Sequence, residues 1–301
     1  MLALVIYQKK IKLKNKLSSK IIIYLILSIP FSVKGDSISK LEQLKVNLKD
    51  MSSVAIGFSG GADSSFLLKV ASEVLGDKVL AITVNSTLHP KRELSDAVQF
   101  AQQMNAHHIV IDVDMDEIED LKENLENRCY FCKKIIFSKI KDVAKQENIP
   151  YVLDASNYDD LQDYRPGIKA LERVGVVSPL VDVGLGKSEI RELSKQMDLD
   201  TWDKPAFACL ASRFPYGIKI TKSRLEQVEK AESFLHSLGI KQFRVRYHIE
   251  VARIEVSKND FQRILTHSDE IVKKFKELGF KYITLDIEGY RTGSLNEVLK
   301  Q

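Results

Sequence analysis

Apolar residues alternate along the first half of the chain between short continuous runs and longer amphipathic segments. The short runs predict buried strands at residues 53–58, 78–85, 107–113 and 151–154. Apolar residues at helical spacing predict the flanking and intervening helices at residues 37–51, 66–75, 93–104 and 129–146. A regular alternation of strands and helices predicts an α/β fold built on a parallel sheet with crossover helices.

Weaker signals follow this alternation. Residues 178–183 suggest a fifth strand, and Ser188 is a suitable N-cap for a helix at 189–197. After Gly217 the pattern predicts a helix, two strands, a helix and a strand at residues 222–238, 243–247, 251–256, 260–278 and 282–286. We therefore expect one domain at residues 37–218 and a smaller C-terminal α/β domain at 219–301, which binds substrate or mediates oligomerisation.

Residues 1–36 are an N-terminal extension of different composition. Residues 1–35 contain seven lysines and no acidic residue, and the apolar stretch 21–33 follows the lysines as the h-region of a signal peptide follows its n-region. This stretch is short for a membrane span, which needs about 20 residues. Two interpretations stay open, an upstream start that is not translated and a real anchor or signal.

Composition and charge limit the class of protein. The chain has 301 residues, 44% of them apolar, which is enough to bury a full core. The formal net charge is +4, but residues 36–301 carry −3 because the seven N-terminal lysines are excluded. A nucleic-acid partner normally requires a basic surface, so this balance argues against one. Three cysteines are too few for a disulfide scaffold, which favours a reducing cytoplasm.

A glycine-rich turn lies between the first predicted strand and its helix. Its residues are Ser59, Gly60, Gly61, Ala62, Asp63, Ser64 and Ser65. The two glycines allow a tight turn that brings N–H groups close to an anion, and the helix N-terminus and the serine hydroxyls can add to the binding of phosphate. The turn has neither the lysine of a Walker loop nor the spacing of a dinucleotide fold. The alternative is an ordinary turn in which Ser64 caps the helix.

The pattern S-G-G-x-D-S-S resembles the signature of the N-type ATP pyrophosphatases, a group that includes GMP synthetase, NAD synthetase and tRNA thiolases. The resemblance implies that ATP is cleaved between its α and β phosphates, that this loop holds the pyrophosphate, and that AMP passes to the substrate. It also implies that Asp63 helps to organise pyrophosphate and Mg²⁺. Because ligands of doubly wound sheets bind beyond the carboxyl ends of the strands, we expect adenine near Asn85 and the segment 154–157 at the same crevice.

A second motif spans residues 204–217, Lys-Pro-Ala-Phe-Ala-Cys-Leu-Ala-Ser-Arg-Phe-Pro-Tyr-Gly. A cysteine in a proline-bounded loop, followed by Ser-Arg and Pro-Tyr-Gly, resembles the LarE family of ATP-dependent sulfur transferases over about residues 37–299. The resemblance implies an adenine nucleotide alpha-hydrolase-like (PP-loop) fold. It further implies that a carboxylate of a pyridinium dicarboxylate mononucleotide is adenylated and converted to a thiocarboxylate, in the synthesis of the nickel-pincer nucleotide cofactor of lactate racemase.

The cysteines have more than one possible role. Cys129 and Cys132 form a C-x-x-C pair at the start of a predicted helix, where the helix N-terminus is expected to lower a thiol pKa. Such a pair can bind a metal, act in redox chemistry or lie buried as small apolar residues. In the LarE family some members have only the cysteine that matches Cys209, which gives up its own sulfur and becomes dehydroalanine. Other members have all three and are thought to hold an iron–sulfur cluster, so the pattern here favours a [4Fe–4S] cluster on Cys129, Cys132 and Cys209.

Two predicted strands of the C-terminal region carry alternating charged residues. Arg244 and Arg246 lie on one face of the first strand, and Arg253 and Glu255 alternate in the same way on the next. From the residues alone this is a salt-bridged sheet face. The family resemblance implies instead that the arginine pair binds the substrate phosphate and that a nearby acid binds metal or nucleotide, with Ser212 and Arg213 also assigned to the phosphate site.

Two rival functions share the nucleotide loop. A tRNA thiolase or a synthetase domain of the GMP or NAD type would differ in the acceptor, and a nucleotide sensor would have lost the chemistry. The sequence carries no added RNA-binding module and no N-terminal nucleophile for glutamine hydrolysis, while Asp63 and three thiols argue against lost chemistry. We therefore expect a cytoplasmic, homo-oligomeric enzyme that acts on a small-molecule nucleotide, with neither a nucleic-acid nor a membrane partner for its folded body.

Overall fold

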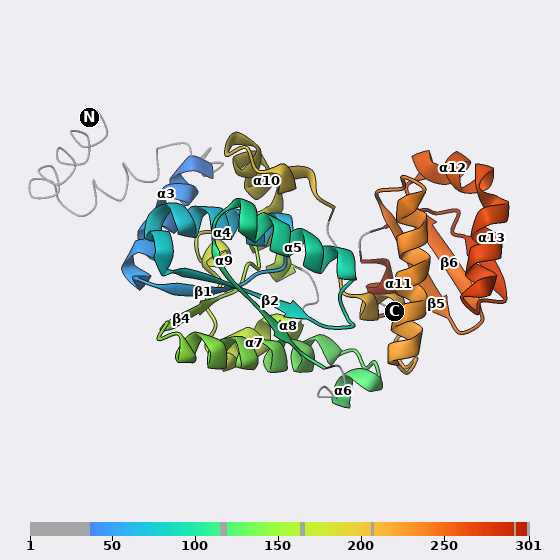
Figure 1. Cartoon of the computed structure of the whole chain (residues 1–301), viewed down its shortest axis with the longest axis horizontal. Helices are drawn as coiled ribbons and strands as arrows, with labels where there is room; N and C mark the ends of the chain where they lie inside the picture. The colour runs from blue at the N-terminus through green and yellow to red at the C-terminus, as the bar shows by residue number, and fades with distance from the viewer. Residues whose placement is uncertain (1–36, 115–118, 163–165, 206–207, 292, 300–301) are drawn as a thin grey trace, which may run out of the picture. The chain divides into compact units, whose positions relative to one another are not determined.

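The computed structural model describes residues 37–114, 119–162, 166–205, 208–291 and 293–299 (Figure 1). The apolar stretch 21–33 lies outside these residues. The chain divides into two compact units, residues 1–39 and 40–301, and the architecture below is that of the second unit together with the helix α3 (Ser37–Met51) that leads into it. In the described part of the chain, no helix combines the length and apolar character needed to cross a bilayer.

A four-stranded parallel sheet forms the nucleotide half of the fold, as the alternating pattern predicts. Its strands are β1 (Val54–Gly57), β2 (Val79–Asn85), β3 (His107–Asp112) and β4 (Tyr151–Leu153). Their order is β3-β2-β1-β4, and every pairing is parallel. The chain therefore crosses in opposite directions on the two sides of β1, so the loops that follow β1 and β4 diverge at the carboxyl edge of the sheet.

Helices cover both faces of this sheet (Figure 1). One buried cluster packs α3, α4 (Ala62–Leu75), α5 (Lys91–Gln103), α9 (Pro179–Asp182) and α10 (Lys187–Gln196) on the first face. A second cluster packs α7 (Arg128–Gln146) and α8 (Pro166–Val174) on the other. Because β1 and β2 are buried on both faces, their sequences are continuous apolar runs rather than alternating ones.

A three-stranded sheet forms the C-terminal part. Strands β5 (Phe243–His248) and β6 (Val251–Val256) pair antiparallel, and β7 (Tyr282–Leu285) pairs parallel to β6. Helix α11 (Lys222–Ser237) begins at Thr221, whose Oγ1 accepts the N–H of Arg224 at 3.3 Å. The apolar cluster of this region also takes in Leu88 and Val113 from the loops after β2 and β3. Short elements complete the fold at Gly76–Lys78, Glu119–Lys122, Tyr158–Gln162, Asp200–Asp203, Leu210–Arg213, Lys258–Asp260 and Ser294–Leu299.

Three expectations from the pattern are wrong. Residues 178–183 contain the helical turn α9 instead of a fifth strand, because Pro179 lacks the N–H a strand needs and favours a first helical position, and only Val177 forms a bridge, to Leu153. Ser188 does not cap α10. That helix begins at Lys187, whose N–H donates to Asp159 Oδ2 at 2.8 Å, with Gly186 as the N-cap.

The predicted helix at 260–278 is two helices, α12 (Phe261–Thr266) and α13 (Ser268–Glu277), which meet at His267. The hydroxyl of Thr266 donates to the carbonyl oxygen of Gln262 at 2.9 Å. A threonine that bonds back to the preceding turn in this way weakens and bends a helix. The break therefore has a local cause that apolar periodicity does not register.

We expect Leu48→Ala to lower the free energy of unfolding by about 2–5 kcal/mol, because Leu48 of α3 is fully buried in the first-face cluster and its loss leaves a cavity. Val46→Ala is the matched control on the same helix, since Val46 is 53% exposed and its truncation should change the free energy by no more than about 0.5 kcal/mol. Urea denaturation of the two variants measures the difference. Equal small effects would show that α3 is not part of the cooperative core.

Candidate functional site

The glycine-rich turn lies at the carboxyl edge of the parallel sheet, between β1 and α4. Gly61 is the N-cap of α4, so Ser64 lies inside the helix and does not cap it. The Oγ atoms of Ser59 and Ser64 are 3.1 Å apart, and Ser64 Oγ donates to the carbonyl oxygen of Gly61 at 3.2 Å. Ser65 Oγ is buried and has no hydrogen-bond partner among the described residues. The turn therefore presents a helix N-terminus and serine hydroxyls at one place, as anion binding requires.

Gly60 is required by both backbone conformation and space. Its φ is +69°, in the left-handed region that disfavours side chains. A Cβ at this position would lie 2.9 Å from the Cα and Cβ of Ala97 on α5. The turn can therefore approach α5 this closely only with glycine at position 60.

Asp63 contacts the other side of the crevice. Asn157, in the loop after β4, donates through Nδ2 to Asp63 Oδ2 at 2.9 Å, and Asn157 is fully buried. Burial raises the pKa of Asp63, a shift that the Asn157 hydrogen bond opposes and the neighbouring Asp160 carboxylate reinforces. Lys187 and Arg191 lower it by smaller amounts. The prediction that the segments after β1 and β4 face one crevice agrees with this contact.

The end of β4 is held by a buried carboxylate. Asp154 accepts hydrogen bonds from Ser178 Oγ at 2.7 Å, from Ser156 Oγ at 2.9 Å and from Lys133 Nζ at 3.0 Å. Lys133 belongs to α7 and directly follows Cys132, so this network ties the cysteine helix to the carboxyl edge of the sheet. Asn85, at the end of β2, donates to Asp112 Oδ1 of β3 at 2.7 Å.

Two of the three cysteines lie at the start of α7. Cys129 and Cys132 are the second and fifth residues of this helix, and Cys209 directly precedes the short helix Leu210–Arg213. Cys129 is exposed, and the other two are partly buried against the apolar cluster of the C-terminal part. The expected depression of a thiol pKa by the helix N-terminus is not what Cys132 shows. Burial raises its pKa, and the neighbouring Cys209 and Cys129 thiols add to that rise.

Cys132 and Cys209 pack against the same apolar cluster, but the three thiols do not form a ligand set. Among the described residues, no three histidine, cysteine, aspartate or glutamate side chains form a group that could hold a metal ion. Thiolates are the donors that an iron–sulfur cluster takes, so the chemistry of the three side chains fits a cluster. Their positions do not, because the three sulfur atoms would have to move closer together to bind one.

Arg213 fixes the segment that follows Cys209. The side chain is fully buried, with Nε and Nη2 bound to the two carboxylate oxygens of Glu232 at 2.8 and 2.9 Å. Its Nη1 donates to the carbonyl oxygens of Ala208 and Cys209 and to Ser212 Oγ. The sequence suggested Arg213 as a phosphate ligand, and the structure gives its guanidinium these internal partners. Glu232 was missed, although a glutamate on the apolar face of α11, between Val228 and Leu235, is a recognisable signal.

The charged residues of β5 and β6 form a buried network rather than a solvated face. Arg246 binds Glu255 through Nε and Nη2 at 2.9 and 2.8 Å, and its Nη1 donates to the carbonyl oxygen of Ser212 at 2.7 Å. Arg253 donates to the same Glu255 at 3.0 Å, and its side chain is 40% exposed.

Arg244 lies 5.2 Å from the ring centre of Tyr290. Burial, with the nearby Arg213 next, lowers the pKa of Arg244 to about 10, so it stays charged at neutral pH.

A lysine that sequence reasoning did not single out connects the two motifs. Lys204, the first residue of the second motif, donates to the carbonyl oxygen of Gly60 in the nucleotide turn at 3.2 Å. It also contacts Asp96 at 2.9 Å and Glu93 at 3.1 Å, both on α5. Residues 206–207 of the motif lie outside the described residues. No local pattern marks Lys204, because its partners are distant in sequence.

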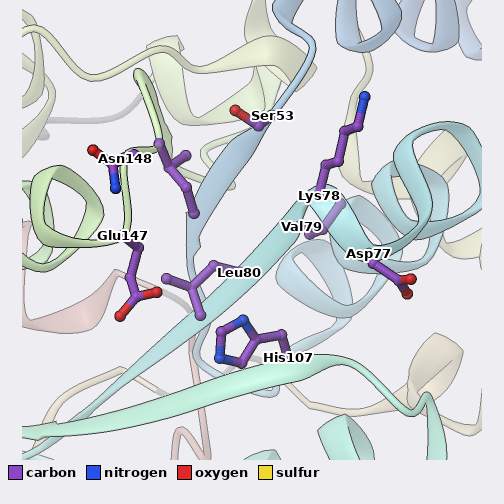
Figure 2. A pocket seen from close by; sticks show the side chains of 9 residues that line it. Ser53, Asp77, Lys78, Val79, Leu80, His107, Glu147 and Asn148 are labelled. Atoms are coloured by element: carbon purple, nitrogen blue, oxygen red, sulfur yellow. The ribbon is translucent and has the colours of Figure 1, made fainter.

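A separate pocket of about 220 Å³ lies at the opposite, amino edge of the parallel sheet. Figure 2 shows its lining, where Val79 and His107 begin β2 and β3 and Ser53 precedes β1. Ligands of doubly wound sheets bind at the carboxyl edge, where the glycine-rich turn lies. This pocket is therefore not part of the nucleotide site.

Comparisons with known proteins agree with this geometry. The sequence profile of the NAD synthase family matches residues 36–144. An uncharacterized protein of Synechocystis sp., slr1717, is 41% identical over 87% of this chain and 98% of its own length. The pyridinium-3,5-bisthiocarboxylic acid mononucleotide synthase of Lactiplantibacillus plantarum is 36% identical over 87% and 95%, and an uncharacterized protein of Methanocaldococcus jannaschii, MJ0830, is 33% identical over 85% and 98%. These alignments extend well beyond the segment shared with NAD synthase.

We expect Gly60→Ala to weaken binding of Mg·ATP by on the order of tenfold or more, because the added Cβ must push the turn away from α5. Gly76→Ala is the matched control. Gly76 also has a left-handed φ, +59°, but a Cβ there meets nothing within 4 Å. Both variants should lose about 1–2 kcal/mol of stability from backbone strain, and only the first should lose affinity in calorimetric titration. Equal affinities would contradict the assignment of the turn.

Proposed function

The chain belongs to the LarE family of ATP-dependent sulfur transferases, and we propose that it adenylates a carboxylate of a pyridinium dicarboxylate mononucleotide and converts it to a thiocarboxylate. The relative from L. plantarum is named for the product of such a reaction, a pyridinium bisthiocarboxylic acid mononucleotide. Within this chain, the main support for the proposal is the contact between Asp63 and Asn157, because it joins the nucleotide turn to the loop after β4. The thiols supply the second half of the chemistry.

Adenylation requires the nucleotide turn to hold the pyrophosphate end of ATP. A carboxylate oxygen of the substrate attacks the α phosphorus, and pyrophosphate leaves into the turn. We assign to its binding the N–H groups at the start of α4 and the hydroxyls of Ser59, Ser64 and Ser65, the last of which is fully buried. We assign Asp63 to Mg²⁺, which neutralises phosphate charge when bound, and Asn85 to the adenine end of the crevice.

Sulfur transfer requires a sulfur nucleophile beside the acyl-adenylate. If the nucleophile is a sulfide, it attacks the acyl carbon, the bond to AMP breaks, and a thiocarboxylate remains. If it is the Cys209 thiolate, the same attack gives a thioester, and loss of the Cα proton with cleavage of the Cβ–S bond then releases the thiocarboxylate and leaves dehydroalanine. AMP is a far better leaving group than oxide, which is why the carboxylate is adenylated first. Cys209 delivers the sulfur if that sulfur is its own, and it would hold the cluster if the sulfur is an added sulfide. In both cases it lies in the segment that Lys204 joins to the nucleotide turn.

We assign the substrate phosphate to the cationic network of β5 and β6. Arg253 is the accessible member, and Arg244 is a buried cation on the neighbouring strand, where it lies opposite Glu255. Glu255, Arg246 and the carbonyl oxygen of Ser212 form the internal frame that sets their positions. Arg213, with its partner Glu232, is a positioning residue in this proposal.

We also propose that Cys129, Cys132 and Cys209 hold a [4Fe–4S] cluster, which when bound offers an open iron site for a sulfide. The support is the three-cysteine pattern. The alternative is that Cys209 gives up its own sulfur.

Asp63→Asn should keep the fold and lower substrate-dependent pyrophosphate release by at least about a hundredfold, because the charge that organises metal and pyrophosphate is removed.

The Asp63→Asn variant should also be more stable than the wild type. Burial raises the folded-state pKa of Asp63, so the wild type loses stability as pH rises from the unfolded pKa of about 3.9 through the folded value. Asp182→Asn, at another carboxyl whose pKa burial raises, is the control that should gain stability and keep activity.

Undiminished pyrophosphate release in Asp63→Asn would contradict the assignment. Replacing the pyridinium substrate by transfer RNA or by a purine nucleotide tests the two rival acceptors, and release with either in place of the pyridinium nucleotide would favour that rival. Stability curves measured from pH 3 to pH 8 test the linkage separately from the chemistry. A difference between variant and wild type that persists unchanged below the unfolded pKa would exclude Asp63 titration as its cause.

Protein purified without oxygen should be brown and contain about four irons per chain if the cluster forms. Replacing any one of the three cysteines by serine should then remove iron and activity together. The sacrificial route predicts that Cys209→Ser alone is inactive, and that one turnover removes the mass of one hydrogen sulfide from the chain. Intact-protein mass spectrometry decides, and mass loss at Cys209 without bound iron would overturn the cluster.

A further inference from the structure

Lys204 connects the segment 204–210, which carries Cys209 and is called the sulfur segment below, to the nucleotide turn. An ammonium group has three donors. Here they meet three acceptors, the carbonyl oxygen of Gly60 and the carboxylates of Asp96 and Glu93, at 3.2, 2.9 and 3.1 Å. The Lys204 side chain is only 15% exposed, so water competes weakly for these contacts. Its position is therefore set by the nucleotide turn and α5 together.

The same segment is anchored at further points. Arg191 of α10 donates to the carbonyl oxygens of Trp202 and Lys204 at 2.9 and 2.6 Å. After Cys209, the N–H of Leu210 donates to the carbonyl oxygen of Leu88 at 2.7 Å. The segment is thus fixed to the loop after β1 at one end and to the loop after β2 at the other. The five Cα-to-Cα steps from Lys204 to Cys209 can span at most about 17 Å, so the first anchor limits where Cys209 can lie.

The charges around Lys204 make this anchor responsive to the nucleotide. Lys204 has two carboxylate partners beside Gly60, those of Asp96 and Glu93, and Arg92 also approaches Glu93 at 3.6 Å. A pyrophosphate group bound in the turn adds several negative charges close to Gly60. It therefore attracts the ammonium and repels the two carboxylates, which changes the balance of forces on the Lys204 contact. Gly60 itself cannot yield toward α5, since even one extra carbon would meet Ala97 at 2.9 Å.

We propose that Lys204 is a positioning residue that couples occupancy of the nucleotide turn to the placement of Cys209, so that adenylation and sulfur delivery occur in step. The proposal rests on the function proposed above. Its chemical benefit follows from the fate of the intermediate. When sulfur is not in place, water attacks the acyl carbon, AMP leaves, and the carboxylate is regenerated with one ATP consumed. Loss of the Lys204 contact should therefore waste ATP rather than simply slow the enzyme.

The first test measures the ratio of thiocarboxylate formed to pyrophosphate released. In Lys204→Met this ratio should fall by on the order of tenfold, because a charged hydrogen bond to the turn is lost. Lys204→Arg keeps a cation and should restore part of the ratio. Lys40→Met is the matched control, since Lys40 also binds one carbonyl oxygen, that of Gly184, and one carboxylate, that of Glu189. A ratio in Lys204→Met equal to that of the wild type would overturn the proposal, even if both rates fell.

The second test needs no pyridinium substrate. The alkylation rate of Cys209 by iodoacetamide is followed by peptide mass spectrometry with and without Mg²⁺ and α,β-methylene-ATP, which cannot be cleaved to pyrophosphate. In the wild type and in Lys40→Met the nucleotide should slow alkylation several-fold, and in Lys204→Met it should have no effect. A wild type without nucleotide dependence, or a Lys204→Met variant that keeps it, would overturn the coupling. Absence of pyrophosphate release from wild type with the pyridinium substrate would instead contradict the proposed function alone.

Discussion

The parallel pairing of β1 with both β2 and β4 is the constraint on which the rest of the molecule depends. Because the crossover direction reverses at β1, the loops after β1 and β4 diverge at the carboxyl edge, where ligands of such sheets bind. The glycine-rich turn and Asn157 meet across it through Asp63. The cysteine helix reaches the same edge through Lys133 and Asp154. Strand order therefore determines which of these segments meet at the carboxyl edge of the sheet.

Buried ion pairs determine the path of residues 208–213, the segment that contains Cys209. Arg213 with Glu232 and Arg246 with Glu255 are two-point contacts inside the protein, where the cost of removing the charges from water offsets much of their attraction. Their value lies in geometry. Arg213 holds the carbonyl oxygens of Ala208 and Cys209, and Arg246 holds that of Ser212, so a segment with little regular structure has a defined path. Removing either glutamate would leave a buried cation without its partner.

The sequence predicts the fold well and the site in part, for physical reasons. Apolar periodicity located α3 at 37–51 and β6 at 251–256 with the bounds that the structure has, and the glycine-rich turn marked the crevice. Periodicity failed where a local backbone feature decides, as at Pro179 and Thr266. The raised pKa of Cys132 depends on burial by distant segments, which the helix-terminus argument does not include. The partners of Lys204 are likewise distant in sequence, and the Glu232 partner of Arg213 is marked only by its place on the apolar face of α11.

Gly60 lies so close to Ala97 that the nucleotide turn also restricts the size of the side chain at position 97, which belongs to no motif. A larger side chain at 97 would push into the same space as a side chain at 60, so the two positions form one steric unit although 37 residues separate them. Ala97 is fully buried, and its backbone as well as its methyl group borders the turn. Substitutions at these positions are consequently not independent in their effects. We therefore expect a relative with a larger side chain at 97 to differ in the position of α5 or in the turn, although no motif includes this alanine.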